Sequence, residues 1–418
     1  MIVISATADH YRMKVLQIVK TSEAAYWAAR QAMVLARRGV SVHVVLPSAS
    51  GAAIPVWEHT GAALHFLDCS LPLSNPLKLP NAAKKVRQLV DQIDPDLIHS
   101  HSVTTTMMLR IALGRNHRVP RVFQVPGPLH LEHWYTRQAE LALAGENDFW
   151  IASSEFTREL YRAASVAADR LFLSYYSTDT SVPGSQRAGY LRKRLNIPQK
   201  ALVVGNINLI YPPKRFLGHR IGLKCHEDVI EAITLVQRKQ KDVWGVLVGG
   251  TFGKSPAYEN KLKQFADQKG AGRILMPGKF SPREVTLSWP DFDCAVHVPL
   301  SENCGGVIEP LMAKVPTIAG RVGGLPEVVH DGVTGKLVPI RRPDLLAEAI
   351  LDVLERQPQY KSMAERGCQL VKAMFDSQRC GDEVLAIYRH ILSHDARPDE
   401  FSSEQFLQTQ QSALAASL

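Results

Sequence analysis

Short apolar runs alternate along the chain with longer segments in which apolar residues recur at helical spacing. Val15–Val19, Val42–Leu46 and Ala63–Leu67 are three of the short runs. Between the first two, segment 28–36 carries alanine and leucine at helical spacing, and Gly39 follows its basic end. Runs this apolar, separated by helices, are typical of a parallel sheet covered by helices on both faces. The pattern predicts an α/β protein.

A polar connection at residues 181–200, rich in serine, proline and glycine, interrupts this alternation. Apolar runs resume at Leu202–Gly205 and continue as far as Lys336–Val338. Because 418 residues exceed one ordinary core, we predict two Rossmann-like domains with parallel sheets, residues 1–185 and 186–378.

The two ends of the chain lie outside this pattern. Residues 379–396 contain an amphipathic segment, which we expect to form a helix that crosses back to the first domain. Residues 397–418 are rich in Gln, Ser and Ala, and we expect them to be disordered. Met13 directly precedes the first strand, so residues 1–12 read as an upstream extension; they lack the apolar core of a secretory signal.

Composition and charge narrow the classes of partner. The formal net charge of +9 favours an anionic partner: a nucleotide, an anionic membrane surface or nucleic acid. No nucleic-acid-binding motif accompanies the charge, so we expect no nucleic-acid partner. The amphipathic segment Asn81–Ile93 carries Lys84 and Lys85 off its apolar side, which fits either a membrane surface or simple packing on the sheet. Six cysteines are scattered singly, and no apolar run reaches the ~20 residues of a membrane span, so a cytoplasmic protein is expected.

The densest chemical signal is segment 301–309, Ser-Glu-Asn-Cys-Gly-Gly-Val-Ile-Glu, directly after the apolar run Cys294–Val298. In parallel α/β folds ligands bind beyond the carboxyl ends of strands. Gly305 and Gly306 expose backbone amides before a helix, which favours a negatively charged group. Carboxylates such as Glu302 and Glu309 suit sugar or ribose hydroxyl groups instead. An acid, an amide nest and a second acid match the hydroxyl, phosphate and hydroxyl groups of a nucleotide sugar.

Segment 301–309 resembles the donor-binding motif of the retaining family 4 glycosyltransferases, which have the GT-B fold. The family places its two glutamates one residue further apart, with an aromatic residue between the glycines. When the motifs are aligned on Glu309, Pro316 and the turn 323–327, Gly-Gly-Leu-Pro-Glu, fall where the family has them. The resemblance implies that Glu309 holds the ribose and that Glu302 contacts the donor sugar, with the amides of Gly305 and Gly306 close by.

The resemblance continues through the rest of the second half. Lys224, at the start of a predicted helix, matches the lysine with which the family grips the donor diphosphate, although the following glycine is Cys225 here. Lys214 is the second candidate for this grip and Arg215 the third; their spacing to Lys224 is about twice the usual one, which implies an insertion. Gly250 belongs to the glycine turn that the family places above the donor site.

In the first half the resemblance is weaker. His101 ends an Asp–apolar–apolar–His–x–His segment like the family's and is expected to face the cleft. Pro126 stands where a donor-contacting histidine is usual, and His130 is the candidate to reach that place. Residues 21–27 lack the family's Gly-Gly pair.

Taken together, the resemblance implies an enzyme that transfers a hexose, with retention, from a UDP-sugar or GDP-sugar to a saccharide or lipid-linked saccharide acceptor. Lys224, Glu302 and His101 would take part in catalysis, without metal or other cofactor. Polysaccharide or glycoconjugate synthesis at the inner face of the cell membrane is the expected setting. Two alternatives stay open: an inactive homologue that binds only nucleotide sugars or a partner protein, and a sugar-nucleotide epimerase with the same fold.

Overall fold

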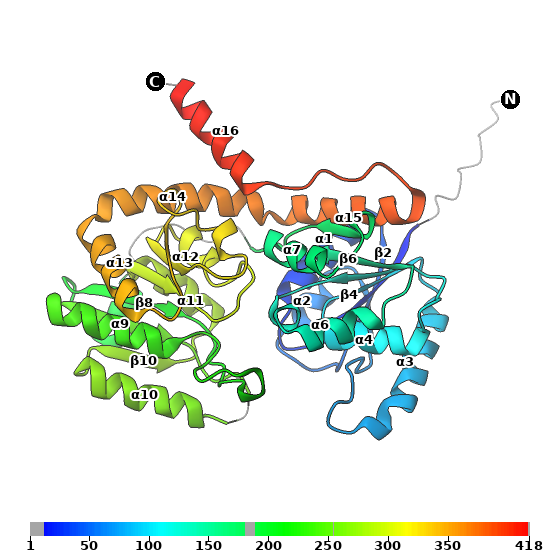
Figure 1. Cartoon of the computed structure of the whole chain (residues 1–418), viewed down its shortest axis with the longest axis horizontal. Coiled ribbons are helices and arrows are strands. Elements are labelled where there is room, and N and C mark those ends of the chain that lie inside the picture. Colours follow the sequence, from blue (N-terminus) through cyan, green and yellow to red (C-terminus); the bar gives the residue numbers. More distant parts are fainter. Residues whose placement is uncertain (1–11, 180–188, 254, 417–418) are drawn as a thin grey trace.

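The computed structural model describes residues 12–179, 189–253 and 255–416. Within these residues, two α/β domains lie side by side, and each is built on one parallel sheet (Figure 1). The two parallel-sheet domains predicted from the sequence are therefore confirmed. The predicted boundary between residues 185 and 186, and the predicted extension up to residue 11, lie outside the described residues.

The N-terminal sheet has the strand order β3-β2-β1-β4-β5-β6-β7. Its strands are β1 Lys14–Ile18, β2 Ser41–Leu46, β3 Ala63–Phe66, β4 Leu97–Ser100, β5 Arg121–Gln124, β6 Asp148–Ala152 and β7 Leu171–Leu173. Its helices are α1 Tyr26–Arg37, α2 Ile54–Glu58, α3 Leu79–Ile93, α4 Val103–Leu113, α5 Leu129–Glu132, α6 Trp134–Ala142 and α7 Glu155–Ala163, with short 3-10 turns η1 Pro76–Lys78 and η2 Ala168–Arg170.

The C-terminal sheet has the order β10-β9-β8-β11-β12-β13. Its strands are β8 Leu202–Ile207, β9 Val243–Val248, β10 Ile274–Gly278, β11 Cys294–His297, β12 Thr317–Gly320 and β13 Lys336–Val338. Its helices are α8 Tyr190–Leu195, α9 His226–Lys239, α10 Ala257–Gly270, α11 Pro282–Ser288, α12 Ile308–Met312, α13 Pro343–Glu355 and α14 Gln357–Met374, with 3-10 turns η3 Arg215–Leu217, η4 Trp289–Asp291 and η5 Leu325–Glu327.

Both strand orders reverse direction next to the first strand of the sheet. In the C-terminal sheet this happens between β8 and β11, and in the N-terminal sheet between β1 and β4. Loops on either side of such a point turn away from each other and leave room for a ligand at the carboxyl edge. A ligand site is therefore expected at the carboxyl ends of β8 and β11.

Helix α15, Ser377–Ser393, returns the chain to the N-terminal domain, where α14 and α15 run along one side of both domains (Figure 1). It packs on α1 at close range, because a Cβ at Gly381 would lie 2.4 Å from Val34 Cγ1. Arg38 and Asp382 add an exposed ion pair of 2.6 Å. The apolar side of α15 joins the core of the N-terminal domain. The chain therefore links the two domains twice, once after β7 and once through α15.

The expectation of a disordered tail over 397–418 is wrong for most of that segment. Helix α16 spans Ser403–Ala416 and projects away from the two domains (Figure 1). Leu407 is buried, and Phe401 and Phe406 pack against the core that includes α14. These apolar anchors offset the low hydrophobicity of the tail, which had favoured disorder.

Candidate active site

A cavity of about 340 Å³ lies at the carboxyl ends of β8 and β11, where the C-terminal sheet reverses its strand order. It brings together residues from two segments of that domain, the connection from β8 to α9 and the connection from β11 to α12, and one residue, Thr178, from the connection between the domains. The lining residues are Thr178, Ile207, Asn208, Leu209, Tyr211, Lys224, Gly306, Ile308 and Glu309. Of the residues predicted from the sequence, Lys224, Gly306 and Glu309 therefore share one cavity.

Glu302 lies beside this cavity, at the centre of a chain of polar contacts. Its carboxylate accepts from the Lys224 ammonium and, at 2.9 Å, from Nε2 of His297. Asn208 donates its side-chain amide to Nδ1 of the same imidazole at 3.2 Å, which leaves Nε2 as the protonated nitrogen. Burial opposes ionisation of Glu302, but Lys224 and His297 outweigh it and hold the pKa of Glu302 well below its usual range. The site thus contains a fixed carboxylate charge.

Gly306 and Glu309 form the other side of the cavity. Gly306 has a φ of 75°, and a Cβ there would lie 2.2 Å from His297 Nε2, so only glycine fits. Helix α12 then begins at Ile308, as predicted for this segment. Glu309, in its first turn, accepts from the indole N–H of Trp289 at 3.3 Å. Burial raises the pKa of Glu309, and the Trp289 hydrogen bond only partly opposes this shift.

Lys224 is held at the start of α9 by a backbone conformation that usually requires glycine. Cys225, which replaces the glycine expected from the resemblance, has a φ of 51° and is buried. A left-handed conformation costs a residue with a Cβ roughly 1 kcal/mol. The local turn is therefore the one that a Lys-Gly pair would make, although the sequence departs from it.

The remaining predicted residues of the C-terminal domain lie outside the cavity lining. Lys214 directly precedes η3. Burial lowers the pKa of Lys214, and the positive charge of Lys20, in the N-terminal domain, lowers it further. Arg215 is exposed. Gly250 is buried beside Lys279, where a Cβ would lie 3.3 Å from the lysine Cβ. Gly305 precedes Gly306 and is near Glu302, because a Cβ there would be 3.5 Å from Oε1.

His101 does not face the cleft, which corrects the expectation from the sequence. The side chain is fully buried at the end of β4. The Tyr176 hydroxyl is 3.1 Å from its Nδ1, and the Trp27 ring packs edge-on against the imidazole at 5.4 Å between ring centroids. Trp27 lies in the first turn of α1, after the glycine-poor loop, and its bulky side chain closes the space above the histidine. Burial lowers the pKa of His101 to about 3, and the ring is therefore neutral.

His130, in the short helix α5, is similarly enclosed. Burial lowers its pKa to about 4, despite a hydrogen bond with the Gly127 backbone. Its Nε2 is buried without a hydrogen-bond partner in the described part of the chain. His130 packs against Phe123 at 5.7 Å between ring centroids and does not line the cavity.

The domains meet along a polar seam next to segment 301–309. Asn303 donates to Ser153 Oγ at 2.9 Å. Glu327, at the end of the Gly-Gly-Leu-Pro-Glu turn, accepts from the backbone N–H groups of Glu155 and Phe156 at 2.8 and 2.9 Å. The Tyr175 hydroxyl donates to the same carboxylate at 2.8 Å. A residue of the C-terminal domain therefore completes the N-terminus of helix α7 in the other domain.

Comparison with known proteins assigns the two domains to two matching families. Residues 24–182 match the profile of Glycosyltransferase Family 4, and residues 215–369 match that of Glycosyl transferases group 1. The two matches occur in the order expected for the two halves of one GT-B protein. The chain belongs to the family 4, group 1 glycosyltransferases.

Curated relatives of this family 4 protein include named glycosyltransferases. It is 26% identical to alpha-D-kanosaminyltransferase of Streptomyces kanamyceticus over 56% of this chain and 58% of that protein. It is also 26% identical to D-inositol 3-phosphate glycosyltransferase of Saccharomonospora viridis, over 88% of this chain and 89% of that protein. The chain spans about half the length of the first curated relatives that it matches.

Solved structures share the fold. The Anabaena protein HepE, in complex with UDP-glucose, superposes with a TM-score of 0.75 at 20% identity, over 90% of this chain and 99% of HepE. Sucrose-phosphate synthase of Thermosynechococcus elongatus superposes with a TM-score of 0.73 at 18% identity, over 92% and 100%. The GT-B fold predicted from the sequence is confirmed.

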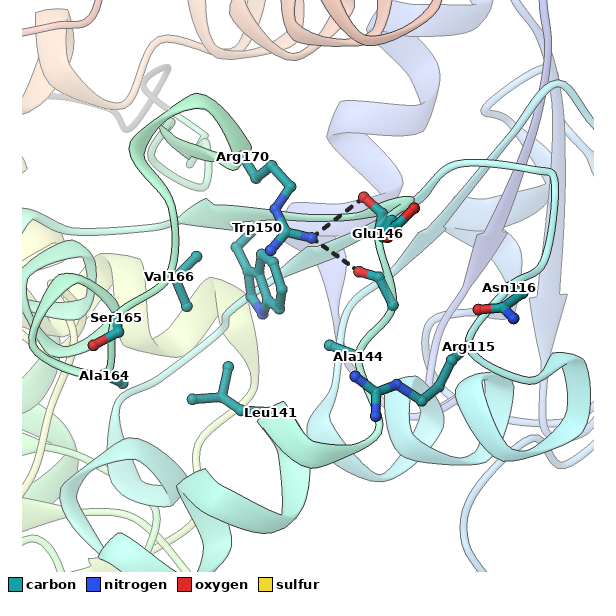
Figure 2. Close-up of a pocket in the computed structure, with 11 residues that line it drawn as sticks. Arg115, Asn116, Leu141, Ala144, Glu146, Trp150, Ala164, Ser165, Val166 and Arg170 are labelled. Carbon is teal, nitrogen blue, oxygen red and sulfur yellow. Dashed lines mark hydrogen bonds between the residues drawn. The ribbon is translucent and has the colours of Figure 1, made fainter.

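A larger cavity of about 550 Å³ lies elsewhere in the N-terminal domain of this family 4 protein (Figure 2). Its walls are the loops that precede β5, β6 and β7, including Arg115, Glu146 and Arg170. Arg170 donates to the backbone carbonyls of Gly145 and Glu146 at 2.9 and 3.2 Å. These loops lie at the amino edge of the sheet, opposite the edge at which α/β proteins bind their ligands. Size alone therefore does not identify the active site.

Three polar residues of the site were missed in the sequence: Asn208, His297 and Asn303. Asn208 and His297 follow or end predicted strands, and this position is the signal that marks them as site candidates. Among the described residues, no group of three or more His, Cys, Asp or Glu side chains is arranged to hold a metal ion. No described helix is long and apolar enough to cross a membrane.

Proposed function

We propose that the protein transfers a sugar from a nucleoside-diphosphate sugar to an acceptor hydroxyl group, with retention of configuration. The observation that carries the proposal is the cavity in which Lys224, Gly306 and Glu309 meet at the switch point of the C-terminal sheet. A cation, exposed backbone amides and a carboxylate in one cavity match a diphosphate beside a ribose.

Each residue has a chemical task in this proposal. Glu309 accepts hydrogen bonds from the ribose hydroxyls. These donors add to the Trp289 indole N–H and help to stabilise the charge of a carboxylate that burial has desolvated. Lys224 stabilises the negative charge that develops on the departing diphosphate. Glu302 accepts from hydroxyls of the donor sugar, and His297 keeps its carboxylate in place when Lys224 turns to the diphosphate.

The reaction breaks the bond between the anomeric carbon and the diphosphate oxygen. The acceptor oxygen forms the new bond on the same face, and its proton passes to an oxygen of the leaving diphosphate. Closure of the domains around the substrates excludes water, which would otherwise hydrolyse the donor. The buried His101 takes no direct part, because Trp27 and Tyr176 cover it.

The donor is a UDP-sugar or a GDP-sugar. HepE, which has the same fold, was solved with UDP-glucose, and this supports UDP as the first nucleotide to test. The acceptor is a saccharide or a lipid-linked saccharide. Polysaccharide or glycoconjugate synthesis in the cytoplasm is the corresponding cellular role.

The first experiment is calorimetric titration with UDP, GDP and ADP. Wild type is compared with Glu309→Ala and with Glu355→Ala, an exposed glutamate at the end of α13. Binding of one nucleotide that is lost only in Glu309→Ala supports the donor site. If no nucleotide binds to well-folded protein, the proposal fails and the inactive homologue takes its place. Product analysis with the donor separates transfer from epimerisation, since epimerases with TM-scores near 0.60 share the fold.

The same proposal places the enzyme at an anionic membrane surface. The apolar side of α3 is already buried, through Val86 and Val90. Helix α3 therefore offers the membrane its exposed basic residues, Lys84, Lys85 and Arg87. Leu77, in the preceding turn, is 91% exposed. Co-sedimentation with anionic vesicles that weakens in high salt is expected. Binding that is indifferent to anionic lipid removes the membrane from the proposal.

A further inference from the structure

Each domain carries a lysine at the carboxyl edge of its sheet. Lys20 follows β1, and Lys214 lies in the loop after β8. Burial lowers the pKa of Lys214, and repulsion by Lys20 lowers it further. The folded chain thus holds two ammonium groups close enough to repel each other across the domain boundary.

A histidine pair extends this arrangement. His133, before α6, and His219, in the loop that carries Lys214, lie 6.4 Å apart between ring centroids. His219 is also close enough to Lys214 for their charges to interact. The basic cluster therefore has two members from each domain: Lys20 and His133 from one, Lys214 and His219 from the other.

The basic cluster has no carboxylate partner among the residues that the structure describes. In the ranges 12–179, 189–253 and 255–416, none of its four members forms an ion pair with a carboxylate, and Nδ1 of His219 is buried without a hydrogen-bond partner. Partial burial of the Lys214 ammonium beside a like charge costs free energy, which an anion bound between the two lysines would offset. An arrangement of this kind at a domain boundary is typical of a site for an anionic ligand.

In each domain an exposed aromatic residue lies close in the sequence to a member of the basic cluster. Trp134 follows His133 and is 70% exposed, and Phe216 follows Lys214 by two residues and is 79% exposed. The flat faces of such rings suit the apolar face of a sugar ring.

We propose that the basic cluster binds an anionic saccharide acceptor, with its charged group between Lys20 and Lys214 and its sugar ring against Trp134 or Phe216. The inference rests on the proposed transfer reaction and names the class of its acceptor. It also reassigns Lys214, which the sequence had suggested for the donor diphosphate. Lys224 lines the donor cavity and Lys214 does not.

The test measures binding of inorganic phosphate, glucose 6-phosphate, glucuronate and glucose to protein saturated with its nucleotide. We expect glucose 6-phosphate or glucuronate to bind, and glucose to bind at least tenfold more weakly. The double variant Lys20→Ala/Lys214→Ala should weaken the charged ligands at least tenfold and leave nucleotide affinity unchanged. Lys200→Ala, which removes an exposed lysine before β8, is the matched control and should behave as wild type.

Each contrary result has a distinct meaning. Lack of saturable binding by every anion, or equal binding by the double variant, overturns the acceptor site. A tenfold loss of nucleotide affinity in the double variant also overturns it, because the lysines then belong to the donor diphosphate. If wild type binds no nucleotide, the proposed function fails, while anion binding by the protein alone still tests the basic cluster. Preference for glucose 6-phosphate over glucuronate identifies phosphate as the charged group, and the reverse identifies a carboxylate.

Discussion

Gly306 packs directly against the imidazole of His297, and the left-handed backbone at Gly306 makes this contact possible. The same imidazole holds the Glu302 carboxylate at 2.9 Å. A glycine in the loop thereby sets the position of a charged group that is four residues earlier in the chain. The proposed donor site depends on this packing as much as on its charged residues.

Gly306→Ala should consequently disrupt the site. The new Cβ would overlap His297 and the backbone would be strained, so we expect a loss of about 1–3 kcal/mol in the free energy of unfolding. Nucleotide binding should fall at least tenfold. Gly305→Ala is the control for stability, because its Cβ would make an ordinary contact at 3.5 Å. Thermal unfolding and calorimetry measure both effects, and equal stability of the two variants would contradict the argument.

Lys224→Ala should reduce the transfer rate strongly. One charge-assisted contact to the leaving diphosphate is worth about 1.5–3 kcal/mol, which corresponds to roughly 10- to 150-fold in rate. Steady-state kinetics with the donor found by titration measure the loss. A rate within about threefold of wild type would remove Lys224 from the proposed mechanism. Lys200→Ala again serves as the exposed control.

Glu309→Gln should separate stability from function. Burial raises the pKa of Glu309, so between its unfolded and folded pKa values the folded state binds more protons. Stability therefore decreases as pH rises through that window, from about pH 4 upwards. The glutamine variant should lose this decrease and be at least as stable as wild type at pH 7, while nucleotide affinity falls roughly tenfold. Melting temperatures across that pH range check the sign, and a less stable variant at pH 7 would contradict it.

Two features could be predicted from local patterns in the sequence: the two parallel-sheet domains, and the loop after β11 in which Gly306 and Glu309 line the cavity. Apolar runs marked the strands, and the two acids around Gly305 and Gly306 marked the loop after β11. Contacts between segments that are far apart in the sequence leave no such local pattern. The burial of His101 depends on Trp27 and Tyr176, which come from other segments of the chain.

Glu327→Ala should weaken the connection between the domains. The carboxylate accepts three hydrogen bonds from the N-terminal domain, two of them from backbone N–H groups at the start of α7. Its removal leaves these donors without a partner in a buried seam, and we expect a loss of about 2–4 kcal/mol. Glu327→Gln keeps one acceptor oxygen and should lose about half as much.

The matched control for Glu327→Ala is Ser281→Ala. Ser281 caps α11 entirely within the C-terminal domain, so its loss is local to that domain. Hydrogen exchange separates the two variants: Glu327→Ala should raise exchange in α7, across the seam, whereas Ser281→Ala should leave α7 unchanged. Equal protection of α7 in both variants would show that Ser154, which already caps this helix, holds it without Glu327. In that case water would replace the Glu327 carboxylate at the start of α7. The seam would then orient the two domains without stabilising the helix.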